Sequence, residues 1–197
     1  MDEQLPLATI QSAVLEFLHD HDDVALFGAQ AVNAYVTEPR MTQDIDILSP
    51  HAAAIADALR DYLGNRFHIA VRIRQVGEDR GYRLYQVRKT GGNRHLVDIR
   101  QTDSLPQIQW ISGVPVIAPA DLIASKVISY HQRKGQPKSG TDWRDIAMLL
   151  LAFPELKAER SVVYDRLQEA AAEPEIVELW QAFVAQEIEA GDEEDEF

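Results

Sequence analysis

Two aspartates, Asp44 and Asp46, are separated by one residue in the segment Asp44-Ile45-Asp46-Ile47-Leu48, whose pattern is typical of a β-strand. Because successive side chains of a strand point to opposite faces, the two carboxylates share one face and the two isoleucines share the other. The Cα atoms of the two aspartates are then about 7 Å apart, and at an effective dielectric constant of about 20 the two charges repel by roughly 2 kcal/mol. A divalent cation relieves this repulsion, and Mg²⁺ is usually held by one or two carboxylates together with substrate phosphates. The alternative is a solvent-facing edge strand that carries two unrelated acids.

A third aspartate, Asp98, lies in a second segment with strand periodicity, and its apolar neighbours occupy the opposite face. Two metal ions that act together are about 3.5–4 Å apart and need shared carboxylates, which three acids from two neighbouring strands can supply. The alternative for Asp98 is an ion pair with Arg94 or Arg100, which is common on exposed strands and contributes little stability.

The residues around the double aspartate resemble the nucleotidyltransferase superfamily of the DNA polymerase β type. The resemblance is carried by Gly28 after a short apolar run, by Tyr35 near the end of a helix-compatible segment, and by the motif Arg40-x-Thr42-x-Asp44-x-Asp46. Within the superfamily, the chain looks most like the small AbiEii-toxin-like and MNT-like nucleotidyltransferases. Ala29 departs from the pattern, because the family has a second Gly or a Ser at this position.

The resemblance implies transfer of a nucleoside monophosphate from an NTP, such as ATP, to a hydroxyl acceptor. It implies that Asp44 and Asp46 are catalytic residues that hold Mg²⁺ or Mn²⁺ against the triphosphate. Asp98 matches the family's third carboxylate, which ligates the metal and helps to deprotonate or orient the acceptor. The residues expected to bind the nucleotide are Gly28, Ala29, Arg40, Thr42 and Lys126. Lys126 receives this role because its helix is similar to the family's second conserved block, and the alternative is a lysine that covers apolar surface with its stem.

The net charge of −13 is unevenly distributed along the chain. Residues 66–100 contain nine of the 19 lysines and arginines but only three acidic residues. A basic region beside an acidic metal site suits a polyphosphate or nucleic-acid substrate. The alternative is that arginines on exposed strand faces keep the sheet soluble and its edges unpaired. We expect an RNA acceptor, such as tRNA, or a protein acceptor near these strands, and the resemblance to toxins implies a cognate antitoxin.

The pattern of apolar residues predicts both helices and strands. The resemblance implies an α+β fold, in which helices pack on a mixed nucleotidyltransferase-type sheet and a C-terminal helical region follows. We predict a nucleotidyltransferase core at 1–118, a helical subdomain at 119–190 and an acidic tail at 191–197. Helices are predicted at 7–19, 29–36, 50–63, 118–130 and 142–153, with two more towards the C-terminus. Strands are predicted at 24–27, 44–48, 69–74, 82–88, 96–100 and 114–117. Ser49 is the expected N-cap of the third helix, and residues 134–141 are expected to form a loop.

Composition excludes several classes of site. The chain contains no cysteine, which excludes disulfides, thiolate metal sites and cysteine nucleophiles. The six histidines show neither zinc spacing nor a paired nucleophile. No apolar run approaches the about 20 residues that cross a bilayer, and the N-terminus does not have the basic start of a signal peptide. We therefore expect a cytoplasmic protein without a membrane partner.

Two other functions are compatible with the sequence. One is a catalytically inactive nucleotidyltransferase-like module that binds a nucleotide or a protein, which Ala29 and the overall acidity favour. The other is an aminoglycoside-type nucleotidyltransferase, whose activity would not need the arginine-rich strands.

Overall fold

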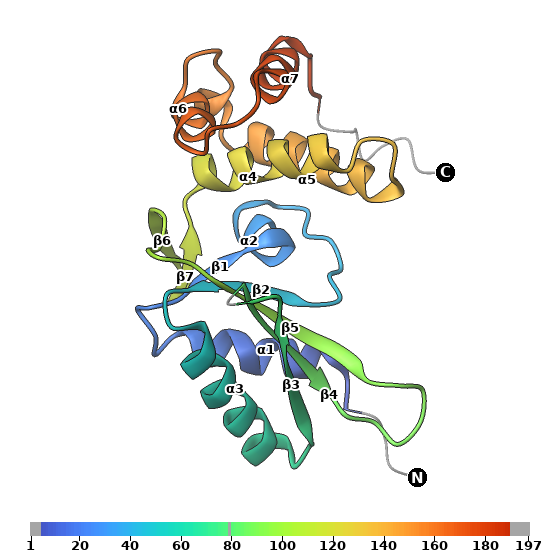
Figure 1. Cartoon of the computed structure of the whole chain (residues 1–197). Coiled ribbons are helices and arrows are strands. Elements are labelled where there is room, and N and C mark those ends of the chain that lie inside the picture. Colours follow the sequence, from blue (N-terminus) through green and yellow to red (C-terminus); the bar gives the residue numbers. More distant parts are fainter. Residues whose placement is uncertain (1–4, 79, 190–197) are drawn as a thin grey trace, which may run out of the picture. The chain divides into compact units, whose positions relative to one another are not determined.

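The computed structural model describes residues 5–78 and 80–189 and confirms the predicted α+β fold (Figure 1). The chain divides into two compact units. The first comprises residues up to 34 together with 38–118, and the second comprises 35–37 together with the residues from 119 onwards. The elements of the first unit are α1 (Leu7–Leu18), β1 (Ala25–Phe27), α2 (Gly28–Tyr35), β2 (Ile45–Ser49), α3 (Ala52–Phe67), β3 (Val71–Val76), β4 (Gly81–Gln86), β5 (Arg94–Gln101), β6 (Ile108–Ile111) and β7 (Val114–Ile117). Those of the second are α4 (Pro119–Gln132), α5 (Pro137–Ala152), the 3₁₀ helix η1 (Pro154–Leu156), α6 (Val162–Glu169) and α7 (Pro174–Ala185).

The first unit is built on one mixed sheet, in which the described strands have the order β3-β4-β5-β2-β1-β7-β6. Strand β2 is parallel to β5 and antiparallel to β1, while β1 is parallel to β7. The outer pairs β3/β4, β4/β5 and β6/β7 are antiparallel. As a result, the two strands that carry Asp46 and Asp98 are neighbours in the middle of the sheet.

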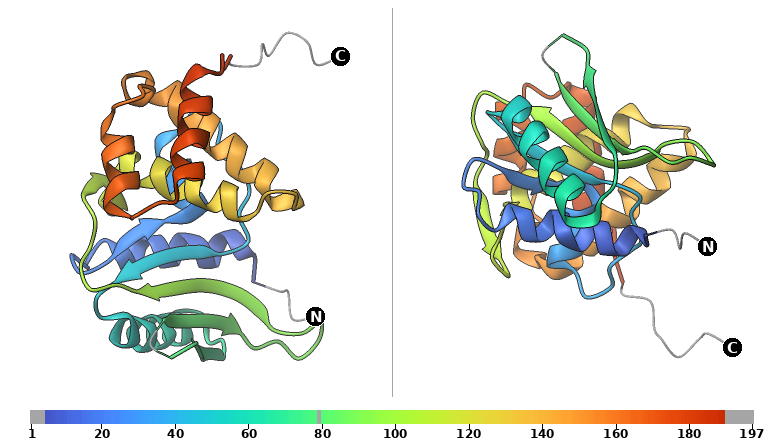
Figure 2. Two further views of the ribbon diagram at one scale, coloured as in Figure 1. Left: turned by 45° about the horizontal axis from the view of Figure 1, so that its top comes forward. Right: turned by 90° about the horizontal axis from the view of Figure 1, so that it is seen from below.

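Helices α1 and α3 cover one face of this sheet and contact each other (Figures 1 and 2). Ile45 and Ile47 of β2 are completely buried, as are Leu59 and Leu63 of α3. Burial of such side chains is the main source of folding free energy, at roughly 1.5–3 kcal/mol for each. Because the isoleucines of β2 point into this core, the side chain of Asp46 points to the opposite face of the sheet.

Strand β5 contains a β-bulge close to Asp98. In its pairing with β4, Leu84 lies opposite Val97 and the next residue, Tyr85, lies opposite His95. Leu96 is therefore an extra residue, and both Leu96 and Val97 are buried. A bulge of this kind interrupts the alternation of a strand. His95 consequently lies on the same face as Asp98, although only Leu96 and Val97 lie between them and a regular strand with this spacing would place them on opposite faces.

The structure contains more regular structure than the sequence predicted in two places: helix α5 begins earlier, and strand β6 is additional. Residues 134–141 were expected to form a loop, but α5 already begins at Pro137, where the fixed φ of proline suits the first helical turn. Strand β6 was not predicted. It pairs with β7 through Ser112 and Gly113, which have φ angles of 50° and 80°. Two consecutive positive φ angles are typical of a type I′ hairpin turn.

Ser49 does not cap the third helix as predicted. It is the last residue of β2, and its hydroxyl donates a hydrogen bond to the carbonyl of Asp23 and accepts one from the amide of His51. Helix α3 begins only at Ala52. The predicted acidic tail at 191–197 lies outside the described residues.

The second unit contains a buried group of charged residues on α4 and α5. The sequence left two interpretations of Lys126, contact with phosphate or coverage of apolar surface by its stem, and in the structure this lysine is buried. Its Nζ donates a hydrogen bond to Asp145 Oδ2 at 2.7 Å and lies 3.7 Å from Asp142 Oδ1. Arg133 Nη1 donates to Asp142 Oδ2 at 2.8 Å, so each buried acid has a cationic partner. No described helix is long and apolar enough to span a membrane.

Removing one partner of the buried Lys126–Asp145 pair should lower the stability of the fold. Lys126→Met leaves Asp145 without the ammonium group, and we expect the free energy of unfolding to fall by about 3–5 kcal/mol. Chemical denaturation measures this loss. The control is Lys126→Met combined with Asp145→Leu, which removes both charges and should be more stable than Lys126→Met alone. Unchanged stability of Lys126→Met would contradict a structural role.

Candidate active site

The register of the sheet places acidic and basic side chains in one row. Asp46 of β2 is the direct partner of Asp98 on β5, and Asp98 is the direct partner of Arg83 on β4. Phe27, the last residue of β1, is the partner of Asp46 on the other side. Residues that are opposite each other in a sheet project from the same face. Asp46, Asp98 and Arg83 therefore share the face that α1 and α3 leave uncovered.

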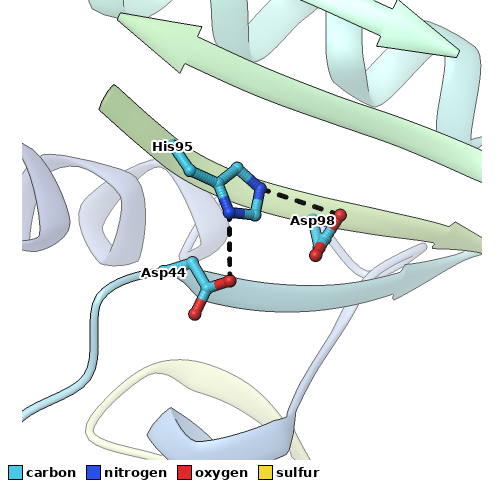
Figure 3. Close-up of side chains that lie close together, drawn as sticks. All are labelled: Asp44, His95 and Asp98. Carbon is cyan, nitrogen blue, oxygen red and sulfur yellow. Dashed lines mark ion pairs between the residues drawn. The ribbon is translucent and has the colours of Figure 1, made fainter. Parts of the chain in front are cut away.

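Asp44 lies immediately before β2. Its carboxylate pairs with one nitrogen of His95, and the other nitrogen of this ring faces Asp98 (Figure 3). His95 Nδ1 is 3.2 Å from Asp44 Oδ2, and His95 Nε2 is 3.8 Å from Asp98 Oδ1. One potential ligand atom from each of the three residues lies within 4.8 Å of the others. In the described part of the chain, this is the group of His, Asp and Glu residues that has the spacing of a metal site.

Positive groups offset the repulsion between these carboxylates. Arg83 Nε donates a hydrogen bond to Asp98 Oδ1 at 2.8 Å. The pKa of His95 is raised above its ordinary value of 6.5, chiefly by the hydrogen bond to Asp44 and further by the charge of Asp98, although burial opposes the shift. The arrangement thus already contains cationic groups at the place where a metal ion would neutralise the acids.

The alternative partners suggested for Asp98 are wrong. Arg94 donates to a backbone carbonyl instead, and the guanidinium of Arg100 lies 4.8 Å from the ring centroid of Phe27. The actual partner, Arg83, lies 15 residues before Asp98 in the chain.

The absence of a side chain at Gly28 leaves room for the carboxylate of Asp46. Its φ of 69° lies in the left-handed region, and a β-carbon at this position would overlap the Asp46 carboxylate. Only glycine combines this backbone conformation with such a close approach. Gly28 and Ala29 begin α2, and amide groups at a helix N-terminus bind anions such as phosphate. Acidic side chains and a potential phosphate site are therefore adjacent.

The loop between α2 and β2 is held by side chains of α2. Asn33 Nδ2 donates to the carbonyl of Arg40 at 2.8 Å, and the Arg40 amide donates to Asn33 Oδ1 at 3.0 Å. Gln30 Nε2 donates to Thr42 Oγ1 at 2.9 Å. Arg40 and Thr42 thus anchor the segment that leads into Asp44, while their contact with nucleotide stays a prediction. Lys126 belongs to the second unit, and its predicted phosphate contact is likewise untested.

Two residues of this site were missed by the sequence analysis. Strand alternation alone places His95 on the face opposite Asp98, because no residue type marks the bulge at Leu96. Arg83 has the periodicity of an exposed strand residue, and only the β4/β5 register shows its partner.

The comparison with protein families decides the classification. Residues 12–196 match the family model described as "Nucleotidyl transferase AbiEii toxin, Type IV TA system". The chain belongs to this family. It is therefore a nucleotidyltransferase by family and by fold. Among curated proteins, no sequence matches the chain significantly.

Solved structures show the same fold at low sequence identity. A proposed nucleotidyltransferase from H. pylori has a TM-score of 0.62 and 15% identity, with 94% of each chain covered. The Megavirus polyadenylate synthase has a TM-score of 0.60 and 13% identity over 75% of this chain, which spans only 32% of that protein. ANT(2")-Ia, solved with adenylyl-2"-tobramycin, has a TM-score of 0.51 and 13% identity, with 90% of this chain and 96% of that chain covered.

A side chain at position 28 should disturb the site. Gly28→Ala places a β-carbon against Asp46 in a left-handed conformation, and we expect the free energy of unfolding to fall by at least about 1 kcal/mol. Gly64→Ala is the matched control, because a β-carbon there meets Ile69 O at an ordinary 3.5 Å within helix α3. This control should be neutral or stabilising. Equal stability changes in the two variants, measured by denaturation, would contradict the close packing at Gly28.

The pKa of His95 should depend on Asp44. In an NMR titration of the imidazole protons we expect a pKa of His95 above 6.5. This pKa should fall in the variant Asp44→Asn. It should not change in the control Asp57→Asn, because Asp57 is an exposed residue of α3. Since the folded-state pKa exceeds the unfolded-state pKa, protonated His95 stabilises the fold fully below the unfolded-state value. This contribution is lost as pH rises through the folded-state value. Asp44→Asn should therefore destabilise the protein more at about pH 5 than at about pH 8, and the reverse order would refute the contact.

Proposed function

We propose that this protein transfers a nucleoside monophosphate from an NTP to a hydroxyl group of an RNA acceptor, with Asp44, Asp46 and Asp98 holding a divalent metal ion. The observations that carry the proposal are the pairing of Asp46 with Asp98 on adjacent parallel strands and the position of Asp44, which has a ligand atom within 4.8 Å of one of Asp98. Membership of a nucleotidyltransferase family supports the same chemistry.

The side chains of the site suit a divalent cation. Carboxylate oxygens are the preferred ligands of Mg²⁺ and are also accepted by Mn²⁺. The side chains of Asp44 and Asp98 are 35% and 27% exposed, so that an ion that keeps some of its water can reach them. A bound ion would neutralise the triphosphate and the charge that develops during transfer. Gly28 keeps the space between Asp46 and the start of α2 free of a side chain.

Groups of the protein itself would bind the triphosphate and position the acceptor hydroxyl. The amides at the start of α2 receive phosphate oxygens of the NTP. Arg83 orients Asp98 through Oδ1, the oxygen that His95 Nε2 also approaches. Oδ2 is then the atom that accepts the hydrogen bond of the acceptor hydroxyl and positions it for attack. Such positioning and charge neutralisation account for most of the catalysis in phosphoryl transfer.

A cavity of about 470 Å³ lies next to Asp98 and suits a nucleotide-sized group. Asp98 forms part of its wall, and three arginines, Arg80, Arg83 and Arg100, line it. Phe27 also lines the cavity, but it is buried and the guanidinium of Arg100 lies over its ring. Guanidinium groups bind phosphates. This lining supports an RNA end as the acceptor and argues against an aminoglycoside, which is itself a cation.

The arginines of segment 66–100 fall into two groups: those on the face of the cavity and those with structural contacts elsewhere. Arg72 and Arg74 of β3 are exposed and lie opposite Tyr85 and Arg83, so they share the face of the cavity arginines. By contrast, three arginines have structural contacts elsewhere: Arg66 binds Glu16, and Arg88 and Arg94 bind backbone carbonyls. A basic surface that is concentrated around Asp98 supports contact with an RNA backbone. The antitoxin and the cytoplasmic location stay predictions.

Label transfer tests the proposed function. The full chain is incubated with each labelled NTP, Mg²⁺ or Mn²⁺, and total RNA, a protein lysate or an aminoglycoside. We expect label in RNA, and we expect Asp46→Asn to reduce the rate by about 100-fold or more, because an electrostatic contribution to the transition state is lost. Asp57→Asn is the control and should retain the wild-type rate.

The outcomes separate the alternatives. Arg100→Gln should raise KM for RNA without changing NTP binding if the cavity holds the acceptor. Label on a protein or on the aminoglycoside would overturn the RNA assignment. NTP binding without label on any acceptor would overturn the enzymatic proposal in favour of a nucleotide-binding module, which is the function that Ala29 favours.

A further inference from the structure

We propose that His95 Nε2 is a metal ligand next to Asp98, with Asp44 orienting the imidazole, and that this site binds Mn²⁺, as a first-row transition ion, in preference to Mg²⁺. This inference rests on the proposed function in one respect, since Asp98 holds the cation there as well. It adds a nitrogen donor to what would otherwise be a site of carboxylate oxygens.

The geometry around the imidazole is that of a ligand. His95 Nε2 is buried and has no hydrogen-bond partner among the described residues, and it lies 3.8 Å from Asp98 Oδ1. With metal–ligand bonds of about 2.0–2.2 Å, two atoms that bind one ion lie up to about 4.4 Å apart. Nε2 and Oδ1 are therefore close enough to share an ion. Asp98 Oδ1 also accepts the hydrogen bond of Arg83, which leaves it a second lone pair.

The other ring nitrogen is already oriented. Nδ1 lies 3.2 Å from Asp44 Oδ2, so the carboxylate fixes the tautomer that leaves Nε2 available. Histidine ligands in proteins usually donate their second ring N–H to a carboxylate or a carbonyl in this way. The ring of Tyr85 lies against the imidazole, with 5.0 Å between the centroids. Both contacts restrict rotation of the ring (Figure 3 shows the carboxylates on its two sides).

The β-bulge is an independent reason to assign a role to His95. A regular strand would direct His95 towards the face that α1 and α3 cover, away from Asp98. The extra residue Leu96 instead turns His95 towards the two carboxylates. Bulges are frequent beside active sites because they re-aim a side chain in this manner.

A nitrogen donor changes the preference among ions. Mg²⁺ is a hard cation that takes oxygen ligands and retains water, whereas imidazole suits first-row transition ions. Mn²⁺ accepts carboxylate as well as imidazole ligands, so the mixed pair formed by His95 Nε2 and Asp98 Oδ1 favours it.

Metal binding without nucleotide tests this inference. The full chain is titrated with Mn²⁺ and followed by electron paramagnetic resonance, with Mg²⁺ as a competitor. We expect Mn²⁺ to bind at least about 10-fold more tightly than Mg²⁺. Pulsed measurements should detect coupling of bound Mn²⁺ to an imidazole nitrogen, a signal that needs no variant and is insensitive to folding defects.

His95→Gln should abolish the nitrogen coupling and weaken Mn²⁺ binding by about 10- to 100-fold, with little change for Mg²⁺. His51→Gln is the matched control, because His51 is exposed and precedes α3. Absence of nitrogen coupling in the wild-type protein, or equal Mn²⁺ affinity in His95→Gln, would overturn the inference while label transfer with Mg²⁺ still supported the function. Conversely, nitrogen-coupled Mn²⁺ without transfer to any acceptor would refute only the function.

Discussion

The repulsion between carboxylates on two neighbouring parallel strands is the constraint on which the site depends. Asp46 and Asp98 are direct partners in the sheet, and Asp44 is close to Asp98. Arg83 and His95 offset this charge in the structure. All these groups are partly exposed, unlike Asp145, which has no exposed surface and is paired with the buried Lys126. The buried pair is a structural element, whereas the exposed group is the one for which we propose that a metal ion replaces cationic partners.

The two faces of the sheet have different functions because strands alternate. Ile45 and Ile47 are buried on the face that α1 and α3 cover, and this burial fixes the position of β2. Asp46 lies on the other face and remains partly exposed. Local irregularities then refine this face. The left-handed Gly28 allows the backbone to touch Asp46, and the bulge at Leu96 adds His95. Rigid support from a core combined with strained or irregular backbone is what a preorganised site requires.

Local charge is more informative than net charge in this protein. The chain carries −13 overall, yet Arg80, Arg83 and Arg100 surround the cavity beside Asp98. Screening in physiological salt limits electrostatic effects to about 8 Å, so a ligand at this cavity meets mainly these arginines. The family model and the fold do not distinguish acceptors, and the cavity lining is the feature that favours an anionic one.

Local sequence patterns were sufficient to predict the features that depend on neighbouring residues: the helices and strands of the α+β fold, the strands that carry Asp46 and Asp98, and the place of Gly28 before α2. These follow from short-range periodicity and backbone preferences. The tertiary structure decided the Arg83–Asp98 contact, across 15 residues, and the Lys126–Asp145 contact, across 19. It also decided the position of His95, because a bulge depends on how two strands pair. Strand register and helix packing join residues that are distant in the chain, and no local pattern encodes which partners will meet.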